Sequence, residues 1–284
     1  MESSRTNPER SLRGAEEPAA RGLMPGVKPS ALEGDLLSAL DRREIEVLFQ
    51  PQFASRDGAV VGAEALARWR HPSLGEIGAR DLFAIAERAA LVAPLSRHVV
   101  ARALEEAAQW PQALTLSLNI TPEELGDPRF APDFAKLIGK SSLDPSRLML
   151  EITEDVLLRN LEQASGALST LRGLGFRTAL DDFGAGFCNF RYLRELPLDA
   201  IKLDKVMVDD VPADAKALAV LRAIIALGKA LDLEIYAEGI ESEIQRAAIQ
   251  AEGCDYWQGF LRAVPMKSDS VVELAKTARG RGHG

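Results

Sequence analysis

Short apolar runs alternate with longer helical patterns along most of this chain, and this alternation limits the possible folds more than any other feature. Each short run has the length and aliphatic content of a buried strand, and the segments between the runs repeat apolar residues at helical spacing. Such alternation is typical of α/β proteins with a mainly parallel sheet. We expect strands at 47–53, 60–68, 114–120, 148–152, 177–181, 200–203, 233–237 and 256–258.

The strand count and the chain length together indicate one closed barrel. Helices are expected between most strands, for example at 80–90, 95–109, 157–174 and 215–231. The first two strands are separated only by residues 54–59, which include Asp57-Gly58, and so short a link favours an antiparallel hairpin. We therefore predict an α/β, TIM-like (β/α)8 barrel with an antiparallel first strand.

The two ends of the chain differ in composition from the segment between them. Residues 1–30 mix Arg, Glu, Pro, Gly and Ala without a sustained apolar period, so we expect a disordered N-terminal tail. Residues 277–284 are expected to form a flexible C-terminal tail. The segment 31–276 is close to the roughly 250 residues typical of a single barrel domain.

Polar side chains stand at the ends of most expected strands. Because side chains alternate along a strand, Glu64, Leu66 and Arg68 share one face of the second strand. The same alternation pairs Ser117 with Asn119, Met149 with Glu151, Ala179 with Asp181, Ala200 with Lys202, and Tyr236 with Glu238. In a barrel these strand ends meet at one mouth, where active sites lie. A single acid after a strand is usually a helix cap, but the repetition over several strands predicts one common site.

The charges at this mouth predict metal ions. The expected cluster contains Glu64, Glu151, Asp181, Asp182, Glu238 and Lys202, with a formal charge of −4. Two divalent cations would neutralise it, and Asn119 would add an uncharged oxygen ligand. With only three histidines in the chain, oxygen ligands and hence Mg²⁺ or Mn²⁺ are favoured over zinc. Paired metal ions of this kind suit phosphodiester hydrolysis by attack of water.

Composition excludes several other functional classes. The net charge of −8 argues against binding of DNA or RNA through overall charge. No apolar run approaches the roughly 20 residues of a membrane-spanning helix, so no membrane association is expected. Cys188 and Cys254 cannot build a disulfide framework, and no signal-peptide pattern precedes the barrel. We therefore expect a cytoplasmic protein.

Seven short motifs occur in the order typical of one family. The motifs are Glu64-Ala65-Leu66, Leu118-Asn119-Ile120-Thr121, Leu150-Glu151-Ile152-Thr153-Glu154, Leu180-Asp181-Asp182-Phe183-Gly184, Ile201-Lys202-Leu203-Asp204, Ala237-Glu238-Gly239-Ile240-Glu241 and Gln258-Gly259-Phe260. Any one of them occurs often by chance, but the ordered set is specific. Over about residues 36–265 the chain resembles the EAL-domain family of cyclic di-GMP phosphodiesterases.

The resemblance implies a barrel enzyme that linearises cyclic di-GMP to pGpG with two Mg²⁺ or Mn²⁺ ions per active site. Carried over by position, the ligands of one metal would be Glu64, Asn119, Glu151 and Asp181, and those of the other Asp181, Asp182 and Glu238. The catalytic residues would be Glu64, Lys202, Glu238 and Gln258. Lys202 should stay protonated among carboxylates, so we expect it to orient the attacking water and offset negative charge rather than act as a simple base.

The resemblance also implies substrate contacts and a regulatory loop. Gln50, Leu66, Arg68 and Glu241 match positions that hold the substrate, and Glu154 matches the residue that anchors the loop after the strand at 177–181. That loop departs from the family pattern at Ala185, Cys188 and Asn189, which replace hydroxyl-bearing residues. The departure bears on regulation and metal affinity more than on the chemistry. A homodimer is a further expectation from the family.

Two alternatives from other functional classes remain open at this point. A catalytically weak EAL module could serve as a receptor for cyclic di-GMP, although the predicted metal ligands are all present. A barrel glycosidase could use Glu151 and Glu238 as its acid pair. The adjacent aspartates, Lys202 and an aromatic content of 6% argue against the glycosidase. A metal chelator separates the phosphodiesterase from the glycosidase, because glycoside hydrolysis would survive chelation.

Overall fold

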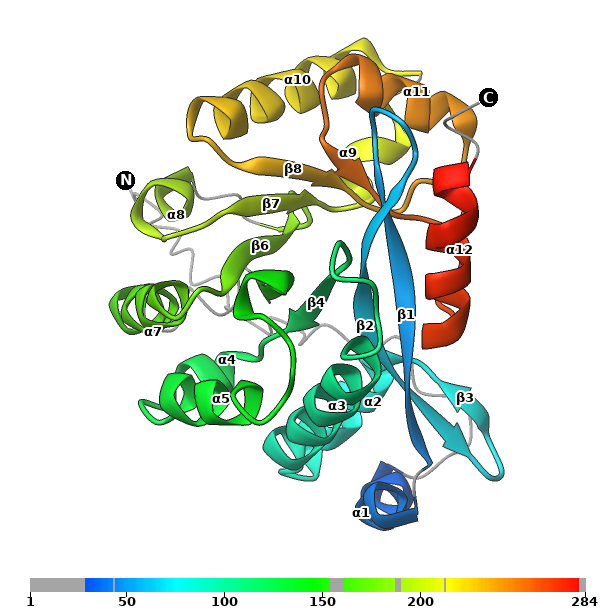
Figure 1. Ribbon diagram of the computed structural model, residues 1–284, viewed down its shortest axis with the longest axis vertical. Coiled ribbons are helices and arrows are strands. Elements are labelled where there is room, and N and C mark those ends of the chain that lie inside the picture. The colour runs from blue at the N-terminus through cyan, green and yellow to red at the C-terminus, as the bar shows by residue number, and fades with distance from the viewer. Residues whose placement is uncertain (1–28, 43, 154–160, 187–189, 212, 281–284) are drawn as a thin grey trace, which may run out of the picture.

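The computed structural model describes residues 29–42, 44–153, 161–186, 190–211 and 213–280. Its nine-stranded sheet closes into a barrel because β1 pairs with both β2 and β9, while β3 pairs only with β2 and extends outside the ring (Figure 1). The strands are β1 (Ile45–Ala54), β2 (Val60–His71), β3 (Gly75–Ile77), β4 (Thr115–Asn119), β5 (Leu148–Thr153), β6 (Arg177–Phe183), β7 (Ala200–Leu203), β8 (Glu234–Ala237) and β9 (Tyr256–Trp257). The predicted α/β barrel is confirmed.

The first strand of the barrel is antiparallel, as the hairpin after it predicts. β1 runs antiparallel to β2 and to β9, and each remaining pair in the ring is parallel. The turn between β1 and β2 is closed by Ala54, whose N–H donates to the carbonyl of Ala59 at 2.9 Å. Gly58 adopts a φ of 69°, and the Asp57 carboxylate accepts from Ala59 N–H at 3.0 Å. Asp-Gly therefore provides the turn that its sequence predicts.

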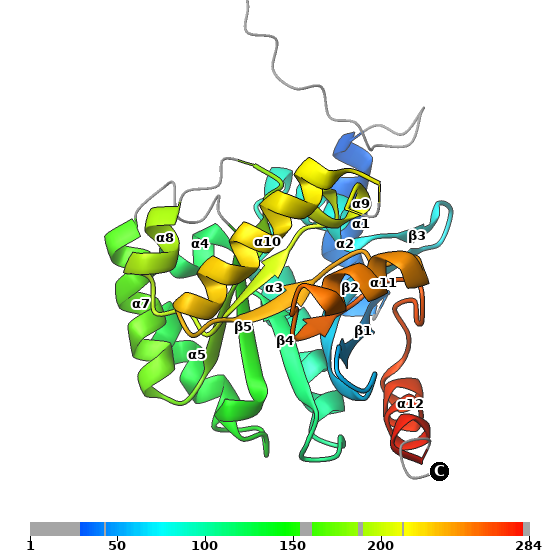
Figure 2. The same ribbon diagram turned by 90° about the horizontal axis from the view of Figure 1, so that it is seen from above.

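Helices surround the strands in both views of the ribbon (Figures 1 and 2). They are α1 (Pro29–Arg42), α2 (Ala79–Arg88), α3 (Val92–Ala107), α4 (Pro122–Leu125), α5 (Phe130–Ile138), α7 (Leu161–Gly173), α8 (Phe190–Glu195), α9 (Val206–Asp209), α10 (Ala215–Ala230), α11 (Glu243–Ala251) and α12 (Ser268–Gly280), with a 3₁₀ turn at Pro145–Arg147. α1 begins inside the segment expected as an N-terminal tail, and α12 extends into the expected C-terminal tail. The first residues of the helix expected at 157–174 lie outside the described part of the chain.

The barrel interior has an apolar layer below a polar one. Met149, Ala179, Ala200 and Tyr236 form a buried cluster inside the ring. Two positions further along the chain from each of these residues come Glu151, Asp181 and Lys202, which lie on their strands, and Glu238, which directly follows β8. Since alternate residues of a strand share a face, the apolar cluster supports the polar layer directly at the carboxyl ends of the strands.

The larger core lies between the sheet and the helices. The alternating alanines of β2 face this core, and the apolar stripe of α10 packs into it through Leu221, Ile224 and Ile225. Gly228 lets α10 approach β8 closely, because an added Cβ would lie 2.4 Å from Ile235 Cδ1. Packing on the barrel thus explains the buried part of this stripe, whereas Val220 on the same helix is exposed. The expected homodimer stays a prediction.

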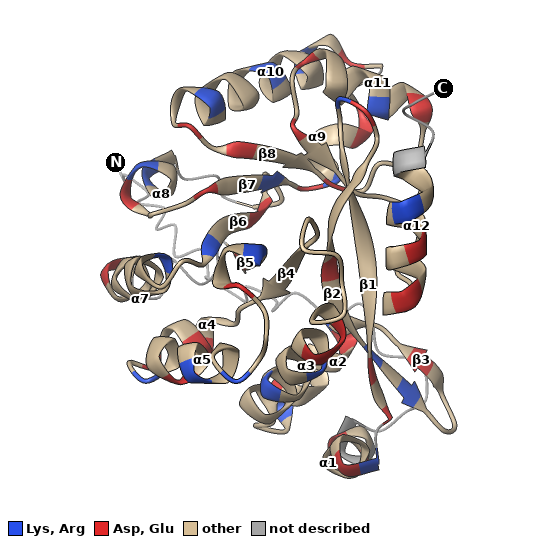
Figure 3. Ribbon diagram, viewed as in Figure 1, with Lys and Arg blue, Asp and Glu red and all other residues tan. Residues whose placement is uncertain are grey.

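The surface carries charges of both signs. In the view of Figure 3, acidic and basic residues are interspersed over the outer helices rather than separated into two faces. Among the residues that the structure describes, no helix combines the length and apolar character needed to cross a bilayer.

Candidate active site

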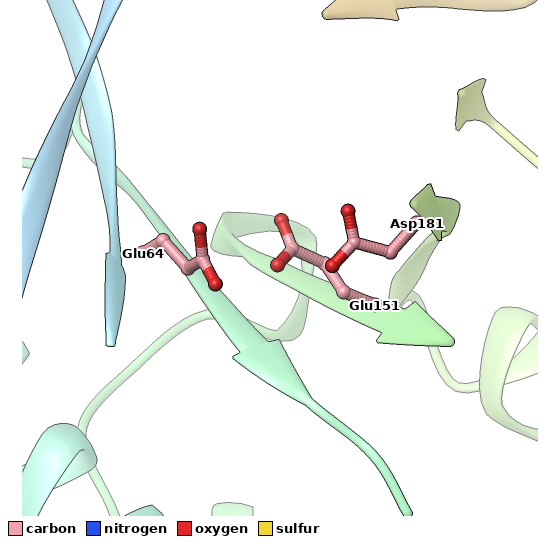
Figure 4. A group of neighbouring side chains, drawn as sticks. All are labelled: Glu64, Glu151 and Asp181. Carbon is pink, nitrogen blue, oxygen red and sulfur yellow. The ribbon is translucent and has the colours of Figure 1, made fainter. Parts of the chain in front are cut away.

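Carboxylates from different strands converge at the mouth of the barrel. Glu64 on β2, Glu151 on β5 and Asp181 on β6 each present an oxygen within 4.8 Å of the others (Figure 4). A second group with the same spacing contains Asp181, Asp182 and Glu238, so Asp181 belongs to both. These are the residues that the sequence places in two metal sites, and the structure brings them together. Their role as ligands stays a prediction.

A backbone irregularity brings two adjacent aspartates into one group. Consecutive residues of a regular strand point to opposite faces, which would separate Asp181 from Asp182. Asp182 instead adopts a φ of 54°, and the pairing of β6 with β7 shifts register between Leu180 and Phe183. Positive φ is uncommon for a residue other than glycine, and such irregularities often redirect a side chain at a functional site.

Lys202 lies at the centre of the carboxylate cluster. Its side chain is 1% exposed, and Nζ lies 2.7 Å from Glu238 Oε1 and 2.9 Å from Glu151 Oε2. The same atom lies 3.0 Å from Asp181 Oδ1 and 3.4 Å from Glu64 Oε2. One buried ammonium therefore contacts carboxylates of both groups.

Burial and charge shift the titration of this cluster in opposite directions. Burial is the largest influence on Lys202 and would lower its pKa, but the surrounding carboxylates raise the pKa well above the ordinary lysine value. Burial raises the pKa of Glu151 and of Glu238 well above the usual carboxyl range, and Lys202 offsets only part of this. Burial, followed by the charge of Asp181, raises the pKa of Asp182 to about 6.

Two amide side chains orient Glu64. Asn119 Nδ2 donates to Glu64 Oε1 at 2.8 Å, and Gln258 Nε2 donates to Glu64 Oε2 at 2.7 Å. These hydrogen bonds and the Lys202 charge outweigh the opposing effect of burial, so the pKa of Glu64 lies below its usual value. Gln258 also donates to Glu238 Oε1 at 3.0 Å. Glu64 is thus held as a carboxylate anion.

The donor set and its unsatisfied atoms fit hard divalent cations. Within the described part of the chain, both carboxylate oxygens of Glu151 and Oδ1 of Asp181 are buried without a hydrogen-bond partner, although Lys202 Nζ lies at ion-pair distance from both side chains. Buried oxygens without partners are costly, and a coordinated cation would satisfy them. Carboxylate and amide oxygens are the ligands that Mg²⁺ and Mn²⁺ prefer.

A cavity of about 610 Å³ opens over the cluster. Its floor includes Glu64, Asn119, Asp181, Asp182 and Glu238, and its side wall includes Leu66, Arg80 and Phe83. Arg80 is the only Lys or Arg among the described residues that line the cavity, and no hydrogen bond or ion pair engages it in the described structure. The cavity thus combines an acidic floor, an apolar wall and a single guanidinium.

The predicted substrate-binding residues have different surroundings. Leu66 lines the cavity, whereas Gln50, Arg68 and Glu241 do not. Gln50 donates to the carbonyl of Ala263 at 2.9 Å. Arg68 lies 3.4 Å from Glu76, and Glu241 lies 2.5 Å from Lys205.

The anchoring role expected of Glu154 falls on a residue outside the described part of the chain, and so do Cys188 and Asn189. The structure therefore describes only Ala185 among the residues where the loop departs from the family pattern, and Ala185 lines the cavity.

Sequence reasoning missed three residues at this site. Arg80 and Phe83 lie three positions apart on α2 and face the cavity together, as helical periodicity permits. Gln52 lies inside the barrel and contacts Gln258. The alternation of Gln50 and Gln52 along β1 placed both on the interior face and was the available signal for Gln52.

Comparison with known proteins gives consistent matches. The family model for the EAL domain matches residues 33–265. The chain is 39% identical over 230 residues to the cyclic di-GMP phosphodiesterase PA2567 of Pseudomonas aeruginosa, covering 80% of this chain and 39% of that protein. It is 35% identical over 242 residues to the cyclic di-GMP phosphodiesterase RocR of the same organism, covering 84% of this chain and 62% of that protein.

A solved structure described as the PaMucR phosphodiesterase in complex with c-di-GMP matches with a TM-score of 0.80 and 31% identity, covering 85% of this chain and 99% of that chain. The chain spans only part of its longer relatives, for example 29% of the protein y4lL of Sinorhizobium fredii, to which it is 37% identical.

Proposed function

This chain belongs to the EAL-domain family, and on that premise we propose that it hydrolyses cyclic di-GMP to linear pGpG in a reaction that requires divalent metal ions. One observation carries the proposal: two groups of carboxylates share Asp181 at the floor of a cavity, with each predicted ligand of both groups present. In the overall reaction, water adds to one phosphorus and the ring is opened by cleavage of the P–O3′ bond.

We propose two Mg²⁺ or Mn²⁺ ions per site. Glu64, Asn119, Glu151 and Asp181 would hold one, and Asp181, Asp182 and Glu238 the other. Such ions polarise phosphate oxygens and lower the pKa of water, which is the chemistry that phosphodiester hydrolysis needs.

Lys202 and Gln258 have distinct roles in this proposal. The protonated Lys202 contacts carboxylates of both groups, so it can stabilise negative charge that develops at the phosphorus and orient water by hydrogen bonding. Gln258 orients the Glu64 and Glu238 carboxylates through its amide group.

The cavity suits a ligand with anionic and aromatic parts. The Leu66 and Phe83 side chains offer an apolar wall for a guanine base, and Arg80 offers a charge-assisted donor. Gln50, Arg68 and Glu241 remain proposed substrate contacts. For Arg68 and Glu241 this requires exchange of their present partners, Glu76 and Lys205.

The test is incubation of the purified protein with cyclic di-GMP and Mg²⁺ or Mn²⁺, followed by chromatography for pGpG. We expect pGpG with either metal and none after treatment with EDTA. Binding of cyclic di-GMP without hydrolysis would identify the chain as a receptor instead. Family membership removes the glycosidase alternative.

Two expectations about the whole protein also stand as proposals, a homodimer and a cytoplasmic location. Sedimentation velocity of the purified chain tests the homodimer, and a single species at the monomer mass of 30.8 kDa would contradict it.

A further inference from the structure

A chain of buried amides links the first strand to the carboxylate cluster. Gln52 on β1 is 1% exposed, and its Nε2 donates to Gln258 Oε1 and to Ser117 Oγ, each at 3.3 Å. Gln258 in turn donates from Nε2 to Glu64 and Glu238 at 2.7 Å and 3.0 Å. The roles stated so far do not involve Gln52.

The chemistry of the partners determines which way each amide points. Gln258 Nε2 donates to Glu64 Oε2 and to Glu238 Oε1, so its NH₂ group points toward the two carboxyl groups. A carboxylate that binds a metal ion is ionised and only accepts hydrogen bonds, so metal binding requires this same orientation. Its carbonyl oxygen then points the opposite way, in a side chain that is 7% exposed, and it needs a donor there. Gln52 supplies that donor.

The barrel holds Gln52 itself in place. Both hydrogens of its NH₂ group are used, one on Gln258 and the other on Ser117 of β4. Ser117 pairs in register with Glu64 of β2, and the register of β1 against β2 shifts between Gln52 and Phe53. The Gln52 amide is therefore held by hydrogen bonds to β4 and to the residue that directly follows β9.

We propose that Gln52 is a positioning residue that fixes the Gln258 amide and, through it, the Glu64 and Glu238 carboxylates in the orientation that binds divalent metal ions. This inference rests on the proposed metal-dependent function, because it gives those two carboxylates their role as ligands. Removing the Gln52 donor leaves the buried Gln258 carbonyl unpaired, so the Gln258 amide loses its defined orientation and each carboxylate loses one of the contacts that orient it.

The experiment is a double-mutant cycle read by metal binding. Four proteins are prepared without metal and titrated with Mn²⁺ by calorimetry: wild type, Gln52→Met, Gln258→Met and the double variant. Hydrolysis of cyclic di-GMP by the same four proteins is measured in parallel. Supporting residues around metal ligands typically contribute about 10–100-fold to metal affinity or activity. We expect Gln52→Met to weaken Mn²⁺ binding about tenfold in the wild-type background and less than about twofold in the Gln258→Met background.

A matched control separates positioning from a general loss of stability. Thr178 is fully buried on β6 and donates to the carbonyl of Pro197 at 2.6 Å, away from the carboxylate cluster. Thr178→Val removes a buried hydrogen bond, as Gln52→Met does, and should lower the melting temperature while Mn²⁺ affinity stays at the wild-type value. Ser117→Ala removes the acceptor of one hydrogen of the Gln52 amide, so it should also weaken Mn²⁺ binding, as Gln52→Met does. If Gln52→Met does not fold, Ser117→Ala serves as the test.

Wild-type Mn²⁺ affinity in Gln52→Met, or in Ser117→Ala where that variant serves as the test, would overturn the proposal. The proposal would also be overturned if Gln52→Met reduced Mn²⁺ affinity by the same factor in the wild-type and in the Gln258→Met background. The failure of the proposed function looks different: a wild-type protein that binds Mn²⁺ and leaves cyclic di-GMP intact would refute hydrolysis, and the titrations would still decide the role of Gln52.

Discussion

Replacing Lys202 by Met separates the electrostatic balance of the site from its chemistry. Lys202 Nζ lies 2.7–3.4 Å from four carboxylates, and the side chain is 1% exposed. Met has a similar length but no charge, so Lys202→Met leaves the carboxylates buried without their cation. Removing one partner of a buried ion pair typically costs about 3–5 kcal/mol. For a chain of this size each kcal/mol lowers the melting temperature by about 2–4 °C, which predicts a decrease of about 10 °C without metal.

The sign of the metal response distinguishes the proposed mechanism. A divalent cation supplies the positive charge that Lys202→Met removes, so Mn²⁺ should bind this variant at pH 8 at least as tightly as wild type. Saturating Mn²⁺ at about 100 times the dissociation constant should restore about 2.7 kcal/mol of stability. Hydrolysis should still fall by about 10²–10³-fold, because the ammonium that stabilises developing negative charge is missing.

Differential scanning fluorimetry with and without Mn²⁺, together with turnover of cyclic di-GMP, measures both effects. Lys229→Met is the matched control, since Lys229 is about half exposed and pairs with Asp255 on the surface, where a pair contributes about 0–1 kcal/mol. Wild-type turnover in Lys202→Met would refute the catalytic role of Lys202. A melting temperature that Mn²⁺ leaves unchanged would refute the electrostatic argument.

Four further predictions follow from the same geometry. Asp181→Asn and Glu64→Ala should each reduce cyclic di-GMP hydrolysis at least about 100-fold, because each removes a ligand of the proposed metal sites. The circular dichroism spectrum should stay unchanged, and turnover near the wild-type rate would contradict the proposed metal site. Excess Ca²⁺ should inhibit turnover in Mg²⁺, because its longer bonds and looser geometry fit this site poorly, and unchanged rates would count against the metal assignment. Mn²⁺ affinity should fall as pH decreases, because protons compete with the cation for the ligand carboxylates. Asp182, with its pKa raised to about 6, contributes one step of this decrease, so calorimetry on Asp182→Asn should show a flatter pH dependence around pH 6. Arg80→Ala should weaken binding of cyclic di-GMP in Ca²⁺ about tenfold, as expected for loss of a charge-assisted hydrogen bond, while leaving Mn²⁺ binding unchanged. Equal nucleotide affinity in this variant would show that Arg80 does not contact the bound nucleotide.

The elements for which the sequence gives no bounds are mostly too short or too irregular to show a periodic pattern. The sequence predicts helices between most strands but gives no bounds for α1, β3, α4, α5, α8, α9, α11 and α12. Several of these elements are single turns or short segments with too few residues for a periodic signal. α1 begins at Pro29, directly after a segment that contains Gly and Pro and has no sustained apolar period, so the sequence gives no clear start for this helix. Long amphipathic helices such as α3 and α10 were predicted within a few residues, because their periodicity extends over several turns.

Local sequence patterns determined the barrel, its antiparallel first strand and the layer of polar residues at its mouth. Strand alternation is a local property, and it places Glu151 and Asp181 on the interior face whatever the strands pair with. Closure of the barrel then decided which side chains meet. Gln52 and Gln258 are 206 residues apart in sequence and touch because β1 pairs with β9.

The tertiary structure also decided features that no periodic pattern contains. The left-handed backbone at Asp182 directs two adjacent aspartates to one site. Arg68 pairs with Glu76 and does not line the cavity, whereas α2 brings Arg80 to its lining. Each depends on contacts between distant segments or on a single dihedral angle. Such contacts form only when the ring of strands has closed, so they follow from the folded structure and not from any one stretch of sequence.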